Sequence, residues 1–224
     1  MILIGQYDSP FVRRVGIALR LYGLPFEHRP WSVFGDGEAV RQVNPLMQVP
    51  VLVLDGGFAL ADSHMMLDYL DGLVAEPLFP RAEPARHRVL RVAALGCGLA
   101  EKAVSLFYER RLHDVLSPVW EARCAAQIGS VVAALEADRG TQPCWFGDTV
   151  SHADIAVACA LRFVTEALPG VVDLAALPRL RGHCERLEAM AVFREIVQPF
   201  AAPAQVPPGL ARRAARRAAK SSPA

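Results

Sequence analysis

The strongest constraint on the fold is a change in hydrophobic periodicity near residue 80. Over the first 75 residues, short apolar runs alternate with segments whose apolar residues recur every three or four positions. These two spacings are typical of strands and helices, respectively. From Ala85 onward every periodic segment has the helical spacing, and a proline-rich stretch separates the two parts. The sequence therefore predicts an α/β N-terminal domain followed by an all-helical C-terminal domain.

The N-terminal part is predicted to contain four strands and three helices in the order β-α-β-α-β-β-α, with the helices packed on a small mixed sheet. Asp55 and Gly56 form a strong turn signal between two apolar runs, which indicates a hairpin. The strands are expected at residues 2–4, 26–31, 49–54 and 58–61, and the helices at residues 10–22, 37–43 and 63–74.

The domain division follows from these patterns. We expect residues 1–75 to form the α/β domain, 76–84 a linker, 85–198 the helical domain and 199–224 a tail. Helices of the second domain are expected at about 85–111, 117–138, 151–166 and 176–197.

One helix start in the second domain is specified in detail. Ser151 and Asp154 fit a capping box, in which each side chain binds the backbone N–H of the other residue. Val150 and Ile155 are spaced for the accompanying hydrophobic staple. We interpret this motif as a folding element without a catalytic role.

The net charge of +1 conceals a basic tail. Five of the 24 Lys and Arg residues lie between residues 212 and 220, and no acidic residue follows Glu195. Residues 1–211 therefore hold 19 basic and 23 acidic residues, a net charge of −4, and we expect no nucleic-acid partner for them. The Ala-, Pro- and Arg-rich tail is expected to be disordered, with contact to RNA or an anionic membrane as the alternative.

Hydropathy and cysteine usage indicate the compartment. No apolar run reaches the roughly 18–20 residues of a membrane-spanning helix, and the N-terminus lacks the pattern of a secretory signal. The five cysteines are odd in number, widely spaced and without a C-x-x-C pair, which indicates neither a disulfide framework nor a metal site. We therefore expect a cytoplasmic protein that uses no metal.

The stretch YDSPFVRRV, residues 7–15, lies where the first strand gives way to the first helix. Ser9 is suited to cap that helix, and Pro10 to occupy its first position. A bound anion such as a thiolate could use the same place, because the free N–H groups and the positive end of the helix dipole point there. Arg13 and Arg14 are further candidate anion binders, unless they lie toward solvent or form ion pairs.

Four motifs together carry a resemblance to a known family. They are SPFVRRV, NPLMQVPVLVLDGG, ADS before the third helix, and GDTVSHADIAVACAL in the helical part. In this order and spacing the chain resembles the cytosolic glutathione S-transferase family over residues 1 to about 197, as a Ser-type member of an unassigned, bacterial-like class. The resemblance implies a thioredoxin-like, glutathione-binding N-terminal domain, a helical domain lining the second-substrate site, and a homodimer.

The resemblance also implies a glutathione site. Val49 and Pro50 match a pair with a cis proline, in which the preceding residue binds the cysteinyl part of glutathione. Asp62 and Ser63 match an acid–Ser pair, in which Ser63 and helix N–H groups would hold the γ-glutamyl carboxylate and Asp62 would attract the ammonium. The alternative is that Ser63 is only a helix cap. Gln48 stands where the family often has a basic residue, so weaker glutathione binding is expected.

Ser9 matches the position of the catalytic Ser or Cys in two groups of the family. A free thiol with a pKa of about 8.5 is mostly protonated at neutral pH, and the thiolate is the nucleophile. A hydroxyl that donates to the sulfur would favour the anion. Tyr7 is the alternative donor, and Phe11 and Tyr108 are candidates for the acceptor pocket.

The resemblance implies an enzyme that transfers the glutathione thiolate to a small, largely apolar electrophile, as in detoxification. Glutathione would be the co-substrate. Glutathione-dependent isomerisation or dehalogenation would use the same thiolate and is a second interpretation. A non-catalytic glutathione-binding or stress-linked interaction protein with the same fold is the alternative from a different class.

Overall fold

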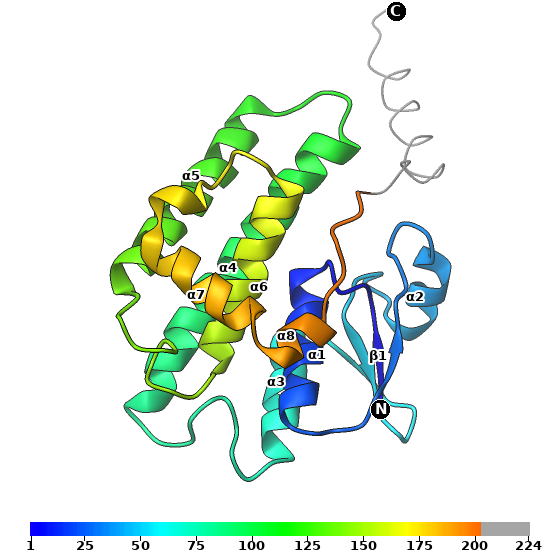
Figure 1. Ribbon diagram of the computed structural model, residues 1–224. Coiled ribbons are helices and arrows are strands. Elements are labelled where there is room, and N and C mark those ends of the chain that lie inside the picture. The colour runs from blue at the N-terminus through cyan, green and yellow to red at the C-terminus, as the bar shows by residue number, and fades with distance from the viewer. Residues whose placement is uncertain (203–224) are drawn as a thin grey trace, which may run out of the picture.

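The computed structural model describes residues 1–202 and contains a small sheet with three helices, followed by helices alone (Figure 1). The first part runs β1 (Ile2–Ile4), α1 (Pro10–Leu21), β2 (Glu27–Arg29), α2 (Gly37–Val43), β3 (Val51–Val53), β4 (Ala59–Ala61) and α3 (Ser63–Gly72). The second part contains α4 (Ala85–Leu112), α5 (Pro118–Asp138), α6 (His152–Ala167), the 3₁₀ turn η1 (Leu174–Ala176), α7 (Pro178–Glu188) and α8 (Ala191–Glu195). The predicted order and the change to an all-helical part are confirmed. The boundaries of the domains and linker stay a prediction.

The sheet has the strand order β2-β1-β3-β4. β1 and β2 are parallel because α1 carries the chain back across the sheet, whereas β3 is antiparallel to both of its neighbours. At the centre of β1, Leu3 lies opposite His28 on one side and Leu52 on the other. Because β1 and β3 are antiparallel, the last residue of β1 and the first residue of β3 lie at the same end of the sheet.

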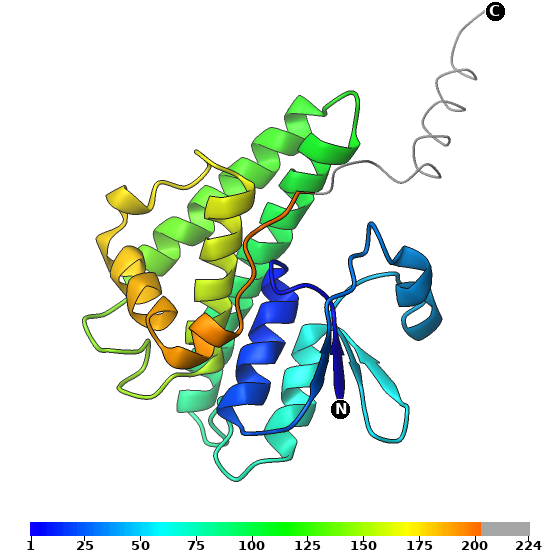
Figure 2. The same ribbon diagram turned by 45° about the vertical axis from the view of Figure 1, so that its right-hand side comes forward.

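Helices α1 and α3 lie between the sheet and the helical domain, and α2 lies apart from them beyond the sheet (Figures 1 and 2). Helix α1 is therefore buried on two sides. One continuous core joins the layers and includes Leu3 and Leu52 of the sheet, Val15 and Leu19 of α1, Met66 and Leu70 of α3, and Ile155 and Cys159 of α6. Since this core crosses the domain boundary, the two parts hold each other in place.

The second core lies among α4, α5, α6 and α7. Helices α4 and α6 approach closely at Gly96, where an added Cβ would lie 2.9 Å from backbone atoms of Ala156 and Val157. Only glycine fits this crossing without movement of one helix. This close approach holds α4 and α6 packed together beside the N-terminal domain.

The predicted capping box is present at the start of α6. The Ser151 N–H and hydroxyl both donate to Asp154 Oδ2, at 2.8 and 2.6 Å. Val150 and Ile155 belong to one hydrophobic core, as expected of the staple. The other carboxylate oxygen of Asp154 accepts the Trp145 N–H at 2.7 Å, a contact that the sequence did not predict.

The single helix predicted over residues 176–197 is wrong. Pro178 occupies the first position of α7, and the chain breaks at Met190, whose backbone is extended, before α8 begins. The break allows α8 to pack on α1, where Arg13 donates to the carbonyl groups of Phe193 and Ile196 at 3.0 and 2.8 Å. These two carbonyls are thus bound by α1 instead of continuing a helical ladder.

Phe200 lies in the segment predicted to be a tail. Its ring contacts the rings of Phe107 and Phe163, with centroids 5.2 and 5.6 Å apart, so this side chain packs on the helical domain. Where the tail begins stays a prediction. The basic residues after 211 lie outside the described residues.

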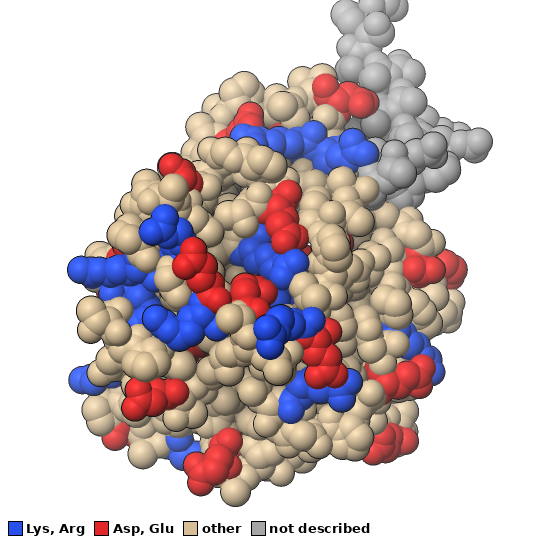
Figure 3. Space-filling view, viewed as in Figure 1, with Lys and Arg blue, Asp and Glu red and all other residues tan. Residues whose placement is uncertain are grey.

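Three further findings bear on the expectations from composition. Among the described residues, no helix is both long and apolar enough to cross a membrane. All five cysteines are free thiols. Acidic and basic side chains alternate over the face seen in Figure 3, which carries no continuous basic surface outside the grey atoms.

Candidate functional site

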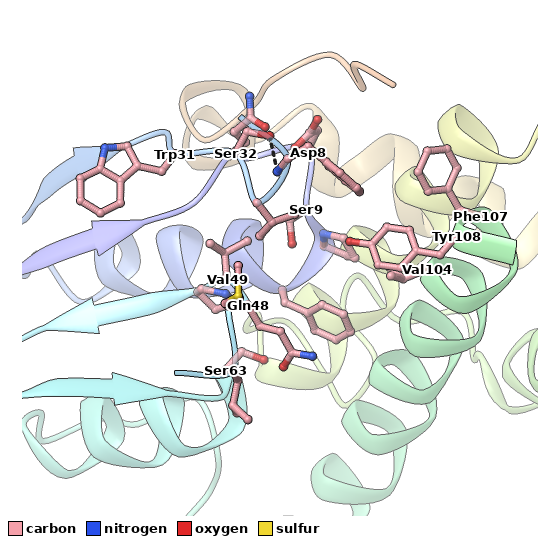
Figure 4. A pocket seen from close by; sticks show the side chains of 18 of the residues that line it. Asp8, Ser9, Trp31, Ser32, Gln48, Val49, Ser63, Val104, Phe107 and Tyr108 are labelled. Atoms are coloured by element: carbon pink, nitrogen blue, oxygen red, sulfur yellow. Dashed lines mark hydrogen bonds between the residues drawn. The ribbon is translucent and has the colours of Figure 1, made fainter. Parts of the chain in front are cut away.

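A cavity of about 1270 Å³ lies between the N-terminal domain and the helical domain (Figure 4). The β1–α1 loop, the segment before β3 and the start of α3 form one side, and α4 forms the other. The sequence-predicted site residues that line it are Ser9, Phe11, Gln48, Val49, Pro50, Asp62, Ser63 and Tyr108. The fold therefore brings all of these predicted residues to one cavity, although they span 100 positions of the chain.

Ser9 is the N-cap of α1, and Pro10 follows at the first position of the helix. The Val12 N–H donates to Ser9 Oγ at 3.4 Å. Capping uses a lone pair of the oxygen, so the hydroxyl proton stays available for donation to a ligand. Figure 4 shows Ser9 facing the space that Gln48 and Tyr108 also face. The two interpretations of Ser9, helix cap and anion donor, are therefore compatible.

Tyr7 is placed differently. Its ring is 9% exposed and stacks on His28, with ring centroids 3.8 Å apart. Burial raises the pKa of Tyr7 to about 12. Tyr7 does not belong to the described residues that line the cavity, whereas Ser9 does. This geometry favours Ser9 over Tyr7 as the donor to a bound thiol.

The segment before β3 forms the floor of the cavity. The Val49–Pro50 peptide bond is cis. Asn44, which is 2% exposed, donates from Nδ2 to the Gln48 carbonyl at 2.8 Å and holds the loop that carries Gln48. Sequence reasoning assigned Asn44 no role, although its place in NPLMQVP was the available signal.

Asp62 and Ser63 lie at the start of α3. Asp62 is the N-cap, and its Oδ1 accepts the His64 N–H at 2.7 Å. Burial raises the pKa of the Asp62 carboxyl, but hydrogen bonds and charge from His64 outweigh burial and leave the pKa below its usual value. Since Asp62 caps the helix, the alternative of Ser63 as a mere cap is wrong. The Ser63 hydroxyl is left for other contacts.

Asp62 also has an unusual backbone. Its φ of +69° lies in the left-handed region that residues other than glycine rarely adopt. Strain of this kind persists where surrounding contacts impose it, and it is common at ligand sites. The strained turn presents both Asp62 and Ser63 to the cavity.

Arg13 and Arg14 do not lie toward solvent, since they are 2% and 1% exposed. Arg13 forms a double ion pair with Glu188, with N–O distances of 2.6 and 2.7 Å, as the ion-pair alternative expected. Arg14 Nη1 instead donates to Ser63 Oγ at 3.2 Å and to Cys97 Sγ at 2.8 Å. The two adjacent arginines thus bind different elements: Arg13 binds α7 and α8, and Arg14 binds α3 and α4.

The side of the cavity formed by the helical domain is largely aromatic. Phe107, Phe163 and Phe200 form one cluster, and Phe34 packs edge-on against Tyr108 with centroids 5.7 Å apart. Burial raises the pKa of Tyr108. Sequence reasoning missed most of this wall, which on α4 comprises Glu101, Lys102, Val104, Ser105, Phe107, Tyr108 and Leu112. Spacings of three and four along the predicted helix were the only signal.

The cavity thus combines a polar side and an apolar side. The polar side offers hydroxyls, an amide and a carboxylate, which suit a peptide with charged ends, and the aromatic side suits an apolar molecule. Within residues 1–202, no cluster of three or more His, Cys, Asp or Glu side chains is placed to hold a metal ion.

Comparison with known proteins indicates the family to which this chain belongs. Residues 3–78 match the family description "Glutathione S-transferase, N-terminal domain", and residues 118–186 match "Glutathione S-transferase, C-terminal domain". The maleylacetoacetate isomerase of Pseudomonas aeruginosa is 31% identical over 205 residues, which cover 87% of this chain and 94% of the isomerase. Glutathione S-transferase U4 of Arabidopsis thaliana is 27% identical over 214 residues, or 88% of each chain.

A solved structure is similar over nearly the whole chain. It is a glutathione S-transferase from Methylobacterium radiotolerans in complex with glutathione sulfonate, with a TM-score of 0.85 and 29% identity. The alignment covers 91% of this chain and 97% of that one. The matched family descriptions, the relatives and this solved structure indicate the same family as the four sequence motifs. The chain belongs to the glutathione S-transferase family.

Proposed function

We propose that this protein binds glutathione in the cavity and activates its thiol as a thiolate, which attacks a small, electrophilic and largely apolar substrate. The observation that carries the proposal is the position of Ser9, a hydroxyl donor at the N-terminus of α1 that lines the cavity. A hydroxyl hydrogen bond and the positive end of a helix both favour a thiolate over a thiol. Ser9 would donate a hydrogen bond and form no covalent bond.

Three groups in the cavity support the orientation of glutathione. Val49, beside the cis Pro50, offers backbone groups for the cysteinyl part, and Gln48 an amide for the glycine end. Asp62 and Ser63 offer a carboxylate and a hydroxyl for the ammonium and carboxylate of the γ-glutamyl end.

The test compares glutathione binding by calorimetry with the ultraviolet absorbance of the thiolate, in the wild type and in Ser9→Ala. We expect both proteins to bind glutathione and only the wild type to show the thiolate. The rate constant kcat/KM for an aryl halide should fall about 10- to 100-fold in Ser9→Ala, as for loss of one hydrogen bond to a charged group. Ser9→Thr, which keeps a hydroxyl, should retain part of the signal.

Ser117→Ala is the matched control. Ser117 caps α5 by accepting the Trp120 N–H at 3.3 Å, and it lies outside the cavity. This variant loses a comparable cap and should keep the thiolate. A normal thiolate signal in Ser9→Ala would overturn the role of Ser9. If the wild type fails to bind glutathione, a non-catalytic interaction role becomes the better proposal.

Phe11 and Tyr108 are proposed to contact the second substrate. Both line the cavity, and Phe11 packs against the core of the helical domain. Tyr108→Ala should raise KM for an apolar electrophile more than KM for glutathione. Equal effects on both constants would contradict this assignment.

Glutathione-dependent isomerisation is a second candidate, because the 31% identical relative from Pseudomonas aeruginosa is a maleylacetoacetate isomerase. The reactions are distinguished by what happens to glutathione. Conjugation to an aryl halide consumes one glutathione and releases one halide per turnover. Isomerisation returns glutathione and releases no halide, whereas hydrolytic dehalogenation releases halide and returns glutathione. Quantifying free thiol and halide during turnover therefore separates them.

We also propose a cytoplasmic homodimer. Met65 and Tyr69 on α3 and Leu73 at its C-cap recur every four residues and are 37–58% exposed, and Leu90 on α4 adds to this apolar set. An exposed apolar stripe of this kind is suited to a second copy of the chain. Light scattering should report a dimer that Tyr69→Glu weakens; a monomeric wild type would contradict the proposal.

A further inference from the structure

Within residues 1–202, Arg14 is a buried cation without an anionic partner. Its side chain is 1% exposed, and its Nη1 donates to Ser63 Oγ at 3.2 Å and to Cys97 Sγ at 2.8 Å. Among the described residues, neither Nε nor Nη2 of Arg14 has a hydrogen-bond partner, and its guanidinium forms no ion pair with a carboxylate within 4 Å.

Arg13, the preceding residue, shows what a satisfied buried arginine looks like in this fold. Its guanidinium binds both carboxylate oxygens of Glu188 and the carbonyls of Phe193 and Ile196. Burying a charge without such compensation costs free energy. An uncompensated cation beside a ligand cavity is therefore expected to act on an anion that the ligand supplies.

Ser63 connects Arg14 to the cavity. An arginine side chain only donates hydrogen bonds, so Ser63 Oγ accepts from Arg14 and its own proton points elsewhere. Because Asp62 caps α3, the Ser63 hydroxyl is also not used by the helix. Figure 4 shows Ser63 at the cavity, below Gln48. Its hydroxyl proton is thus free to donate to an anion there.

We propose that Arg14 is a positioning residue for the anionic end of the ligand: it orients and polarises the Ser63 hydroxyl and supplies the positive charge behind it. The proposal rests on the proposed function, in which this end is the α-carboxylate of the γ-glutamyl group. Arg14 and Ser63 then provide the positive side, and Asp62 the negative side, of a site that complements an amino-acid zwitterion. In a buried setting a charge acts more strongly than in water.

The test measures the affinity of two ligands by calorimetry. One is glutathione, and the other is 4-aminobutyryl-cysteinylglycine, which lacks only the α-carboxylate of the glutamyl group. For Arg14→Met we expect glutathione affinity to fall about 10-fold or more, as for loss of an interaction with a charged group. The affinity for the decarboxylated analogue should change less than about 2-fold, which is within 0.4 kcal/mol.

Kinetics add a readout that a purely structural role would not move. Arg14→Met should raise KM for glutathione while kcat at saturating glutathione stays near that of the wild type. Arg14→Lys keeps the charge without the planar fork, and should restore part of the preference for glutathione over the analogue. This variant keeps the test decisive if Arg14→Met fails to fold.

Arg13→Met is the matched control, since Arg13 is equally buried on the same helix but its hydrogen bonds go to Glu188, Phe193 and Ile196, none of which lines the cavity. We expect it to lose stability without changing the ratio of the two affinities. A parallel fall for both ligands in Arg14→Met, or an unchanged ratio in Arg14→Lys and Arg14→Met, would show a purely structural guanidinium and overturn the proposal. Absence of glutathione binding in the wild type would instead overturn the proposed function.

Discussion

His152, at the start of α6, and Asp71, near the end of α3, form a hydrogen bond of 2.8 Å across the boundary between the two domains. Asp71 also accepts from the Tyr22 hydroxyl and, through Oδ2, from the Phe79 N–H at 3.1 Å. One buried carboxylate thus connects α1, α3, the segment between the domains and α6. The imidazole of His152 is fully buried beside it.

The burial of His152 predicts a loss of stability in acid. Burial lowers the pKa of His152, which the Asp71 carboxylate only partly offsets, and burial also lowers the pKa of His183. The unfolded chain, with a histidine pKa of about 6.5, then binds more protons than the folded chain below that pH. The contribution of both histidines is therefore complete above pH 6.5 and is lost as pH falls.

Urea unfolding between pH 8 and pH 5 measures this effect. The free energy of unfolding should decrease below about pH 6.5, and His152→Gln should show a shallower decrease because one of the two buried histidines is gone. His87→Gln, at an exposed site, should follow the wild type. A flat profile for the wild type would be inconsistent with neutral buried histidines.

Ser151→Ala tests the capping box of α6. Loss of a Ser cap costs about 0.5–2 kcal/mol, which corresponds to a decrease of a few °C in Tm for a chain of this size. Ser130→Ala, on an exposed part of α5, is the control and should leave Tm nearly unchanged. No change of Tm in Ser151→Ala would argue against the capping role.

Gly96→Ala tests the contact between α4 and α6. The added methyl group would meet the backbone of Ala156 and Val157 at 2.9 Å, so the helices must separate, and we expect a loss of about 1–3 kcal/mol in chemical unfolding. Gly98→Ala on the same helix meets nothing within 4 Å and should stabilise by up to about 1 kcal/mol. Equal effects of the two variants would contradict the close crossing.

Gln48→Lys tests the expectation of weak glutathione binding. A charge at this exposed position beside the cavity would attract the glycine carboxylate and lower Kd about 2- to 5-fold, less so at high salt. Gln42→Lys adds the same charge on α2, outside the cavity, and is the control. An equal gain in both variants would indicate a general effect of net charge.

The sequence predicted the polar side of the candidate site but not most of its aromatic side. Ser9, Gln48, Asp62 and Ser63 were found because motifs around them resemble a known family, and the fold brings them to one cavity. The aromatic side of the cavity was missed because helical spacing shows that α4 has an apolar face, but it does not show which residues of the helix face the N-terminal domain. Phe200 was assigned to a tail because its ring partners are distant in sequence.

By itself, the sequence determined those features of the fold that depend on residues close together in the chain. The order of strands and helices and the capping box at Ser151 arise from apolar spacing and from hydrogen bonds between residues three or four apart. Only the tertiary structure decided the burial of the two arginines and the break at Met190. Arg13 lies 175 residues from Glu188 and Arg14 lies 49 from Ser63, and such contacts depend on how whole elements pack, which local patterns do not encode.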